Sequence, residues 1–290
     1  MKPSREALAL AAAAATGVLV GAAMVATRYV VNDIGPLSLG LLRYAIALLC
    51  LAPFVAFHRR VHFARQDLLA IVGLGIIQFA VLIILINLGL RSVTSTRAAL
   101  LFATMPLLTM VVAAAVGSER LSMPKTVGAL LTFAGVAATL GENLLAGSGR
   151  GEWVGIGMVL TAALCGAACS VFYRPYLARY PTLPLATVAM VASVLFLALL
   201  AQYENFFTHW PSLDAKGWAA VVFIGISSGS GYMLLLWALK HASPTRVTVF
   251  LSLSPVTAAW MGVAFLGESI TPGIVLGMLG VAGGLWAATR

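Results

Sequence analysis

Three polar side chains stand inside long apolar runs of this sequence, where each needs a hydrogen-bonding partner. Gln78 is isolated among apolar neighbours, and its amide offers both donors and acceptors. Ser228 and Tyr232 are four residues apart, so they share one face of a helix. Groups of this kind bind a ligand or hold two helices together. We therefore expect a binding pocket lined by these residues, with helix packing as the alternative.

Two prolines in the middle of apolar runs form the second feature. Pro106 follows Met105, and Pro255 follows Ser254. A proline inside a helix removes a backbone hydrogen bond and bends the helix, which exposes carbonyl groups and opens space. We expect Pro106 and Pro255 to act as hinges or to shape the pocket, with Met105 and Ser254 lining it. The alternative is a bend that a membrane helix tolerates.

Arg43 is the one basic residue that falls inside an apolar run. A guanidinium surrounded by lipid is costly, so it needs partners or reaches outward to the interface. Its paired N–H donors match the geometry of a carboxylate. Arg43 is thus a candidate partner for a ligand carboxylate, and a structural role is the alternative. The pocket as a whole would suit a neutral zwitterion with a sizeable side chain.

Groups that catalyse reactions or hold metals are missing from the interiors of these runs. No Asp or Glu lies near the middle of any run, and no His or carboxylate accompanies Cys165 and Cys169. Residues 225–229 match the hydrolase pattern G-x-S-x-G, but that motif requires a strand-to-helix turn. We therefore expect no catalytic residues, no metal and no cofactor.

The apolar runs themselves indicate the class of protein. Of the 290 residues, 61% are hydrophobic and 9% are charged, whereas a soluble domain carries about 25% charged residues. Each run is long enough to cross a bilayer as a helix, and none alternates as a barrel strand does. Because lipid cannot hydrogen-bond the backbone, helices are expected. The predicted fold is an all-α integral membrane protein with ten transmembrane helices at residues 8–27, 37–57, 68–90, 98–117, 126–145, 153–173, 185–203, 217–239, 247–266 and 273–288.

The formal charge of +9 is distributed unevenly between the two sides of these spans. One side holds both termini and twelve basic residues: Lys2, Arg5, Arg59, Arg60, Arg65, Arg120, Lys125, Arg174, Arg179, Lys240, Arg246 and Arg290. The other side holds five: Arg28, Arg91, Arg97, Arg150 and Lys216. Because cytoplasmic loops carry the excess of Lys and Arg, both termini are predicted to be cytoplasmic. Membrane orientation explains the basic charge, so no nucleic-acid partner is expected.

The chain also repeats itself. Residues 70–138 shifted forward by 149 positions bring landmark residues into coincidence: Thr96-Arg97 with Thr245-Arg246, Pro106 with Pro255, Glu119 with Glu268, Gly128 with Gly277, and Gly135 with Gly284. We predict two homologous halves, residues 1–146 and 147–290. Five spans per half is an odd number, so the second half enters the membrane inverted. Inverted repeats are typical of secondary transporters, which bind substrate near the midplane between the halves.

The order of these motifs resembles the EamA repeat of the drug/metabolite transporter superfamily. The second half carries Ala238-Leu239-Lys240-His241-Ala242-Ser243-Pro244, Leu253-Ser254-Pro255, Leu266-Gly267-Glu268 and Gly277. The first half carries Ala98-Ala99-Leu100, Met105-Pro106-Leu107, Ser118-Glu119-Arg120-Leu121, Gly128 and Gly135. Leu42-Arg43-Tyr44-Ala45 resembles the Arg-aromatic element of that family. The resemblance implies ten spans, two inverted five-helix halves and cytoplasmic termini.

These observations together lead us to expect a multi-pass transporter of a bacterial inner membrane, which exports small metabolites by alternating access. Amino acids, aromatic ones included, are the expected substrates, and the missing carboxylates predict an uncoupled or weakly coupled carrier. Its partners would be the lipid bilayer and the substrate, and the chain would act as a monomer or a weak homodimer. The alternatives are a multidrug or nucleotide-sugar carrier, an intramembrane enzyme, and a non-transporting assembly subunit. A nucleotide-sugar site would need paired basic residues, and only Arg43 is available.

The charge distribution makes the topology testable with reporter fusions. A reporter fused after residue 290 is expected to lie in the cytoplasm, and one fused after residue 210 on the opposite side. Paired fusions to alkaline phosphatase and to a fluorescent protein measure this directly. If both positions report the same side, the even number of spans and the inverted second half are wrong.

Overall fold

The computed structural model describes residues 5–56, 61–117, 123–145, 149–242, 247, 250–251 and 253–288. These residues form helices and connecting turns, with no strand among them. The helices are α1 (Arg5–Ile34), α2 (Pro36–Ala56), α3 (Arg65–Gly75), η1 (Ile76–Val81), α4 (Leu82–Gly89), α5 (Ser95–Phe102), α6 (Met105–Ala115), α7 (Met123–Leu145), α8 (Arg150–Phe172), α9 (Arg174–Arg179), α10 (Thr182–Ala201), η2 (Gln202–Glu204), α11 (Ala215–His241), α13 (Leu253–Leu266) and α14 (Pro272–Ala288).

Most of these helices have the length and hydropathy of membrane spans. In the described part of the chain, seven stretches qualify: Arg5–Ile34, Pro36–Val55, Arg65–Gly89, Ser95–Ala115, Arg150–Arg179, Thr182–Glu204 and Ala215–Leu235. Three shorter apolar helices cover Thr126–Gly141, Leu253–Leu266 and Pro272–Gly284, where the remaining three spans were expected. The prediction of an all-helical integral membrane protein is confirmed, and ten complete spans stay a prediction.

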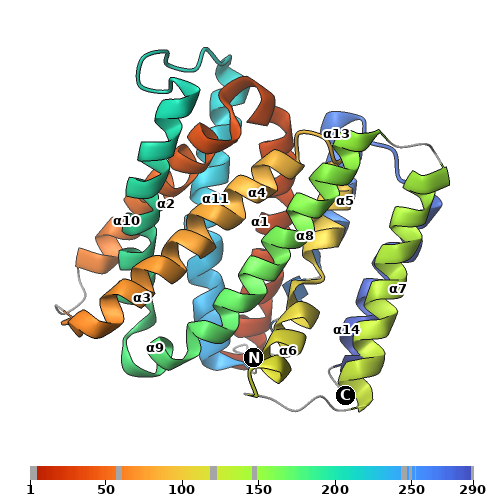
Figure 1. Ribbon diagram of the computed structural model, residues 1–290, viewed down its shortest axis with the longest axis horizontal. Helices are drawn as coiled ribbons and strands as arrows, with labels where there is room; N and C mark the ends of the chain where they lie inside the picture. The colour runs from red at the N-terminus through yellow and green to blue at the C-terminus, as the bar shows by residue number, and fades with distance from the viewer. Residues whose placement is uncertain are drawn as a thin grey trace.

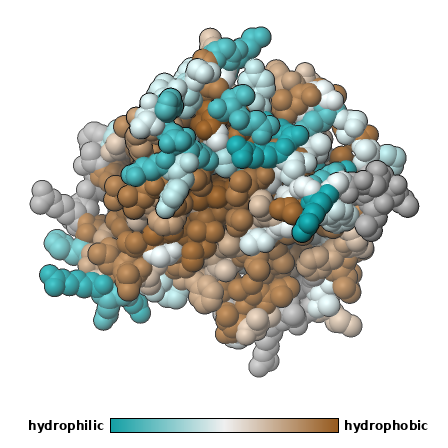
Figure 2. Space-filling view, turned by 45° about the horizontal axis from the view of Figure 1, so that its top comes forward, coloured by the Kyte–Doolittle hydropathy of each residue, from teal (hydrophilic) through white to brown (hydrophobic). Residues whose placement is uncertain are grey.

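The molecular surface fits a lipid environment. Figure 2 shows a broad apolar area, with polar residues gathered above it and at its lower left. Large apolar side chains in the middle of α2, α10 and α14 are exposed, including Leu49 at 73%, Leu195 at 64% and Leu279 at 65%. Soluble monomers rarely expose continuous apolar areas of this size, whereas hydrocarbon chains cover them without cost.

Helices that are distant in the sequence lie side by side in the bundle (Figure 1). α1 contacts α11 and α13, α2 contacts α10 and α11, and α8 contacts α4 and α6. α7 pairs with α14 at one side of the bundle. Both chain ends lie at one end of the bundle, which we call the termini face. We call the opposite end, which carries the connection 205–214, the loop face.

Two stretches that the sequence predicts as continuous helices are interrupted near the centre of the bundle. Between α3 and α4 the chain forms the π-helix η1, which contains Gln78. Between α5 and α6 it forms a turn at residues 103–104. Pro106 lies in the first turn of α6, where the N–H that proline lacks would have no helical partner. Pro255 is the third residue of α13.

Glycine allows α7 and α14 to pack closely. A Cβ atom added to Gly280 would lie 2.6 Å from the Cα atom of Gly135, and one added to Gly284 would meet the Gly128 carbonyl oxygen. Small residues that bring two backbones together are the main device of helix association in membranes. The glycines of these two helices therefore allow close packing between the first half of the chain and the second.

We expect Gly280→Ala to destabilise the protein, because the added methyl group forces α7 and α14 apart. Overpacking of this kind costs about 1–3 kcal/mol. The matched control is Gly157→Ala in α8, where an added Cβ meets no atom within 4 Å. Thermal unfolding of the purified proteins in detergent should lower the Tm of the first variant only. Equal melting temperatures would contradict the close packing of this seam.

Candidate substrate-binding site

Two adjoining cavities lie in the centre of the bundle. The central chamber, of about 160 Å³, lies between α1, α2, η1, α4 and α11. The side chamber, of about 190 Å³, lies between α1, η1, α6, α11 and the start of α13. The two share the lining residues Thr16, Val20, Gln78, Phe102 and Leu235. Along α1 and α11, the residues of the side chamber are among those nearer the termini face, so the space extends in that direction.

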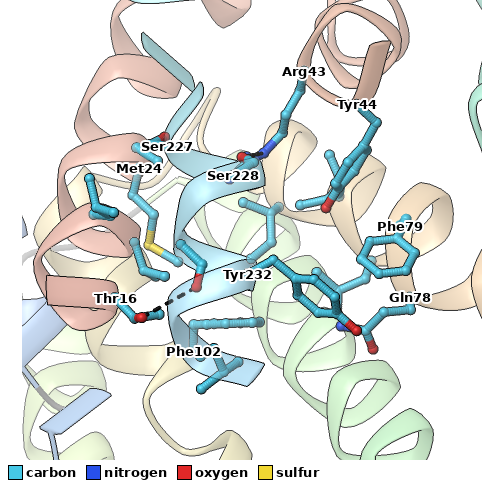
Figure 3. A pocket seen from close by; sticks show the side chains of 18 of the residues that line it. Thr16, Met24, Arg43, Tyr44, Gln78, Phe79, Phe102, Ser227, Ser228 and Tyr232 are labelled. Carbon is cyan, nitrogen blue, oxygen red and sulfur yellow. Dashed lines mark hydrogen bonds between the residues drawn. The ribbon is translucent and has the colours of Figure 1, made fainter. Parts of the chain in front are cut away.

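Arg43 enters the central chamber from α2, and its environment is the most informative feature of the site. Its Nε donates a hydrogen bond to Ser228 Oγ of α11 at 2.7 Å (Figure 3). The Ser228 hydroxyl in turn donates to the Ile224 carbonyl at 2.7 Å. Among the described residues no carboxylate contacts Arg43, and Arg43 lines the chamber. A half-buried cation is therefore held by a single neutral side chain.

Aromatic rings from three helices form one wall of the central chamber. Phe79 of η1 meets Tyr44 of α2 edge to face at 5.3 Å and Tyr232 of α11 at 5.6 Å between ring centroids. These are favourable aromatic geometries, and they fix the rings relative to one another. The side chains of Gln78 and Tyr232 extend toward each other beside this wall (Figure 3). The chamber thus presents rigid apolar surface next to a few polar groups.

The structure distributes the predicted site residues over the two chambers. Arg43, Gln78, Ser228 and Tyr232 line the central chamber. The lining of the side chamber includes Gln78, Met105, Pro106 and Ser254. Pro255 is buried but lines neither chamber, so it has no direct contact with this space. Gln78 is the predicted residue that belongs to both chambers.

Several residues that line the chambers were not predicted from the sequence. Phe79 and Phe102 are apolar side chains in apolar runs, and nothing in their type separates a chamber-facing ring from a lipid-facing one. Thr16 donates hydrogen bonds to the carbonyl groups of Ala12 and Gly231 and so ties α1 to α11. Tyr44 had one usable signal, its place beside Arg43.

Two carboxylates on the loop face accept hydrogen bonds from the N-termini of other helices. Glu268 accepts from the backbone N–H and the hydroxyl groups of Ser95 and Thr96, at 2.7–3.2 Å, at the start of α5. Glu204 accepts from the N–H of Leu37 and from the N–H and hydroxyl of Ser38, at 2.7–3.0 Å, at the start of α2. Negative charge is stabilised at a helix N-terminus. Each carboxylate comes from the second half and binds the first.

Further polar contacts join the halves at both faces. On the loop face, Arg97 forms an ion pair with Glu152. On the termini face, Asp67 accepts hydrogen bonds from Arg179 at 3.2 Å and from the Tyr180 hydroxyl at 2.8 Å. The latter contacts lie at the ends of α3 and α9, away from the side chamber. Among the described residues, the polar contacts between the halves are therefore more numerous on the loop face than on the termini face.

A lipid-facing bundle that encloses a mostly apolar chamber with a few polar groups, between helices distant in sequence, is typical of membrane transporters. In the described residues no group of His, Cys, Asp or Glu side chains is arranged to hold a metal ion. The chain belongs to the EamA-like transporter family, which matches residues 7–141 and again residues 153–290. The predicted family is confirmed by this match.

Individual relatives support the same assignment. The chain is 27% identical to an uncharacterized transporter of Archaeoglobus fulgidus over 93% of this chain and 94% of that protein. It is 30% identical to a probable terminal-alkyne amino-acid exporter of Streptantibioticus cattleyicolor over 69% of this chain and 66% of that protein. A chain of known crystal structure superposes with a TM-score of 0.69 at 21% identity, over 98% of this chain and 97% of its own, so the two share a fold.

Substitutions in the central chamber test whether its polar groups serve transport. We expect Gln78→Ala and Tyr232→Ala each to lower flux about fivefold, as the loss of one hydrogen bond to substrate of about 1 kcal/mol implies. Tyr203→Ala is the matched control, because Tyr203 is 83% exposed and lines neither chamber. Counterflow and thermal melting would be measured on the same samples in liposomes and detergent.

Helix packing makes the opposite prediction for the same variants. If Gln78 and Tyr232 only hold helices together, at about 0.6 kcal/mol each, their loss lowers the melting temperature and leaves flux per folded molecule unchanged. Unchanged flux in both variants would remove these residues from the site.

Proposed function

We propose that this protein exports amino acids, aromatic ones included, across a bacterial plasma membrane by alternating access. The observation that carries the proposal is the central chamber, where Arg43 faces the cavity without a carboxylate partner among the described residues and an aromatic wall stands beside it. A guanidinium recognises a carboxylate, and the aromatic wall suits a sizeable apolar side chain.

The pattern of contacts supports two inverted halves of five spans each, residues 1–146 and 147–290. The family matches twice, once in each half. The contacts of α1 with α11 and α13 correspond to those of α8 with α4 and α6, if each helix is replaced by its equivalent in the other half. In the same way, the contact of α2 with α11 corresponds to that of α10 with α3. The contacts of α2 with α10 and of α7 with α14 each join a helix to its own equivalent in the other half. Inversion across the membrane requires ten spans and is compatible with two cytoplasmic termini.

We favour amino acids over other cargo on two grounds. One relative is named as a probable exporter of terminal-alkyne amino acids. The motif order of this chain also resembles that of the aromatic amino-acid exporter YddG. A nucleotide-sugar carrier is less well supported because Arg43 is the one basic side chain among the described residues of either chamber. A multidrug carrier of the same family is the second candidate, favoured by the largely apolar lining.

Counterflow in liposomes tests the proposal. Purified protein is reconstituted, loaded with unlabelled compound and supplied with the labelled one outside, using phenylalanine, a cationic drug and a nucleotide sugar in separate assays. We expect uptake of phenylalanine alone. Exchange of the drug without exchange of any amino acid would instead assign a multidrug carrier, and no exchange at all would favour an intramembrane enzyme or an assembly subunit.

The same liposomes test coupling. Because no carboxylate lines either chamber among the described residues, we expect counterflow to continue after the proton gradient is collapsed. A strict dependence of flux on an imposed pH gradient would show that a titratable group elsewhere in the chain drives transport.

A further inference from the structure

The two chambers carry an unbalanced charge. Arg43 is the one ionisable cation in their lining, and none of the nine Asp and Glu residues of the sequence is among the described residues that line them. Three described carboxylates, Asp67, Glu204 and Glu268, already accept hydrogen bonds from other helices at the two faces of the bundle. A ligand in the chamber therefore meets positive charge without a compensating negative one.

The guanidinium is positioned to hold a carboxylate. Ser228 accepts a hydrogen bond from Nε, which restricts the orientation of the planar group, and no described residue accepts from its terminal amino groups. Parallel N–H donors bind a carboxylate in a bidentate manner, and such charge-assisted bonds are about twice as strong as neutral ones. Burial among apolar side chains strengthens the attraction further, because water screens it less.

An ammonium group has no equivalent partner in this space. The acceptor side chains in the lining are neutral: the Gln78 amide oxygen and the hydroxyl groups of Thr16, Tyr44, Ser227, Ser228 and Tyr232. The edge-to-face packing of Tyr44, Phe79 and Tyr232 engages part of the ring faces that would otherwise attract a cation. Repulsion from Arg43 opposes any cation that binds nearby. The site thus contains the recognition chemistry for one end of an amino acid only.

We infer that the chamber recognises amphipathic monocarboxylates and that the α-ammonium group of an amino acid contributes little to binding. The inference rests on the proposed function and extends it, because the substrate class then includes deaminated and N-acylated amino acids. Arg43 binds the carboxylate, Ser228 positions Arg43, and the aromatic wall contacts the apolar part of the ligand. Cations of the same shape bind more weakly.

Three compounds that share one phenylalkyl skeleton separate the contributions of the two charges. They are phenylalanine, 3-phenylpropanoate, which lacks the ammonium, and phenethylamine, which lacks the carboxylate. Binding is measured by the thermal shift of purified protein and by competition against labelled phenylalanine in counterflow. We expect 3-phenylpropanoate to compete as well as phenylalanine within about threefold, and phenethylamine to be at least about tenfold weaker, a factor that corresponds to 1.4 kcal/mol.

Variants locate the effect at Arg43. Arg43→Gln should weaken competition by 3-phenylpropanoate at least about tenfold, and Ser228→Ala should weaken it less, because the cation remains. Arg91→Gln is the matched control, since Arg91 is exposed and lines neither chamber. If Arg43→Gln does not fold, the thermal shifts of the unmodified protein with the three compounds still decide the question.

The outcomes distinguish this inference from the proposed function. If phenethylamine binds as well as phenylalanine while 3-phenylpropanoate does not, the inference is overturned although amino-acid transport stands. The same holds if Arg43→Gln binds 3-phenylpropanoate normally. Stabilisation by 3-phenylpropanoate in the absence of phenylalanine counterflow would support the monocarboxylate site and overturn export of amino acids.

Discussion

The absence of hydrogen-bonding partners in lipid is the constraint on which this structure depends. A backbone surrounded by hydrocarbon must satisfy its own polar groups, and helices do so along their whole length. The two interruptions of helix geometry, at η1 and at residues 103–104, lie beside the central and side chambers. Irregular backbone is tolerated at this depth where it lines a cavity. The constraint that imposes helices on the chain therefore also places its irregular segments at the site.

The same constraint explains how the two halves are held together. A helix start leaves N–H groups without partners, and α2 and α5 begin where other helices cover them. Glu204 and Glu268 supply the missing acceptors from the second half of the chain. A carboxylate at a helix N-terminus gains from hydrogen bonds and from the helix dipole together. If the loop face opens during transport, as the proposed function requires, water would replace these hydrogen bonds.

The sequence predicts the class of fold well and the site only in part. Helices follow from composition, because no other structure suits runs so apolar. Gln78, Ser228 and Tyr232 were recognisable because polar groups are rare in such runs, and all three line the central chamber. Phe79 gave no signal, because an apolar ring has the same sequence signature whether it faces lipid or a cavity. The roles of Glu204 and Glu268 also depend on tertiary contacts, since a charge at a helix end normally faces solvent.

Arg43 connects the fold to the proposed function. A guanidinium held by one serine between membrane helices lowers stability, and a leucine or a neighbouring carboxylate would remove that cost. Its position is explained if the missing negative charge belongs to the substrate. A bound monocarboxylate would then neutralise the guanidinium, whereas a zwitterionic amino acid would pair with it and leave its own ammonium group as the remaining charge. Under the proposed function, the ion pair formed by substrate and protein would cost less to hold between membrane helices than the guanidinium alone.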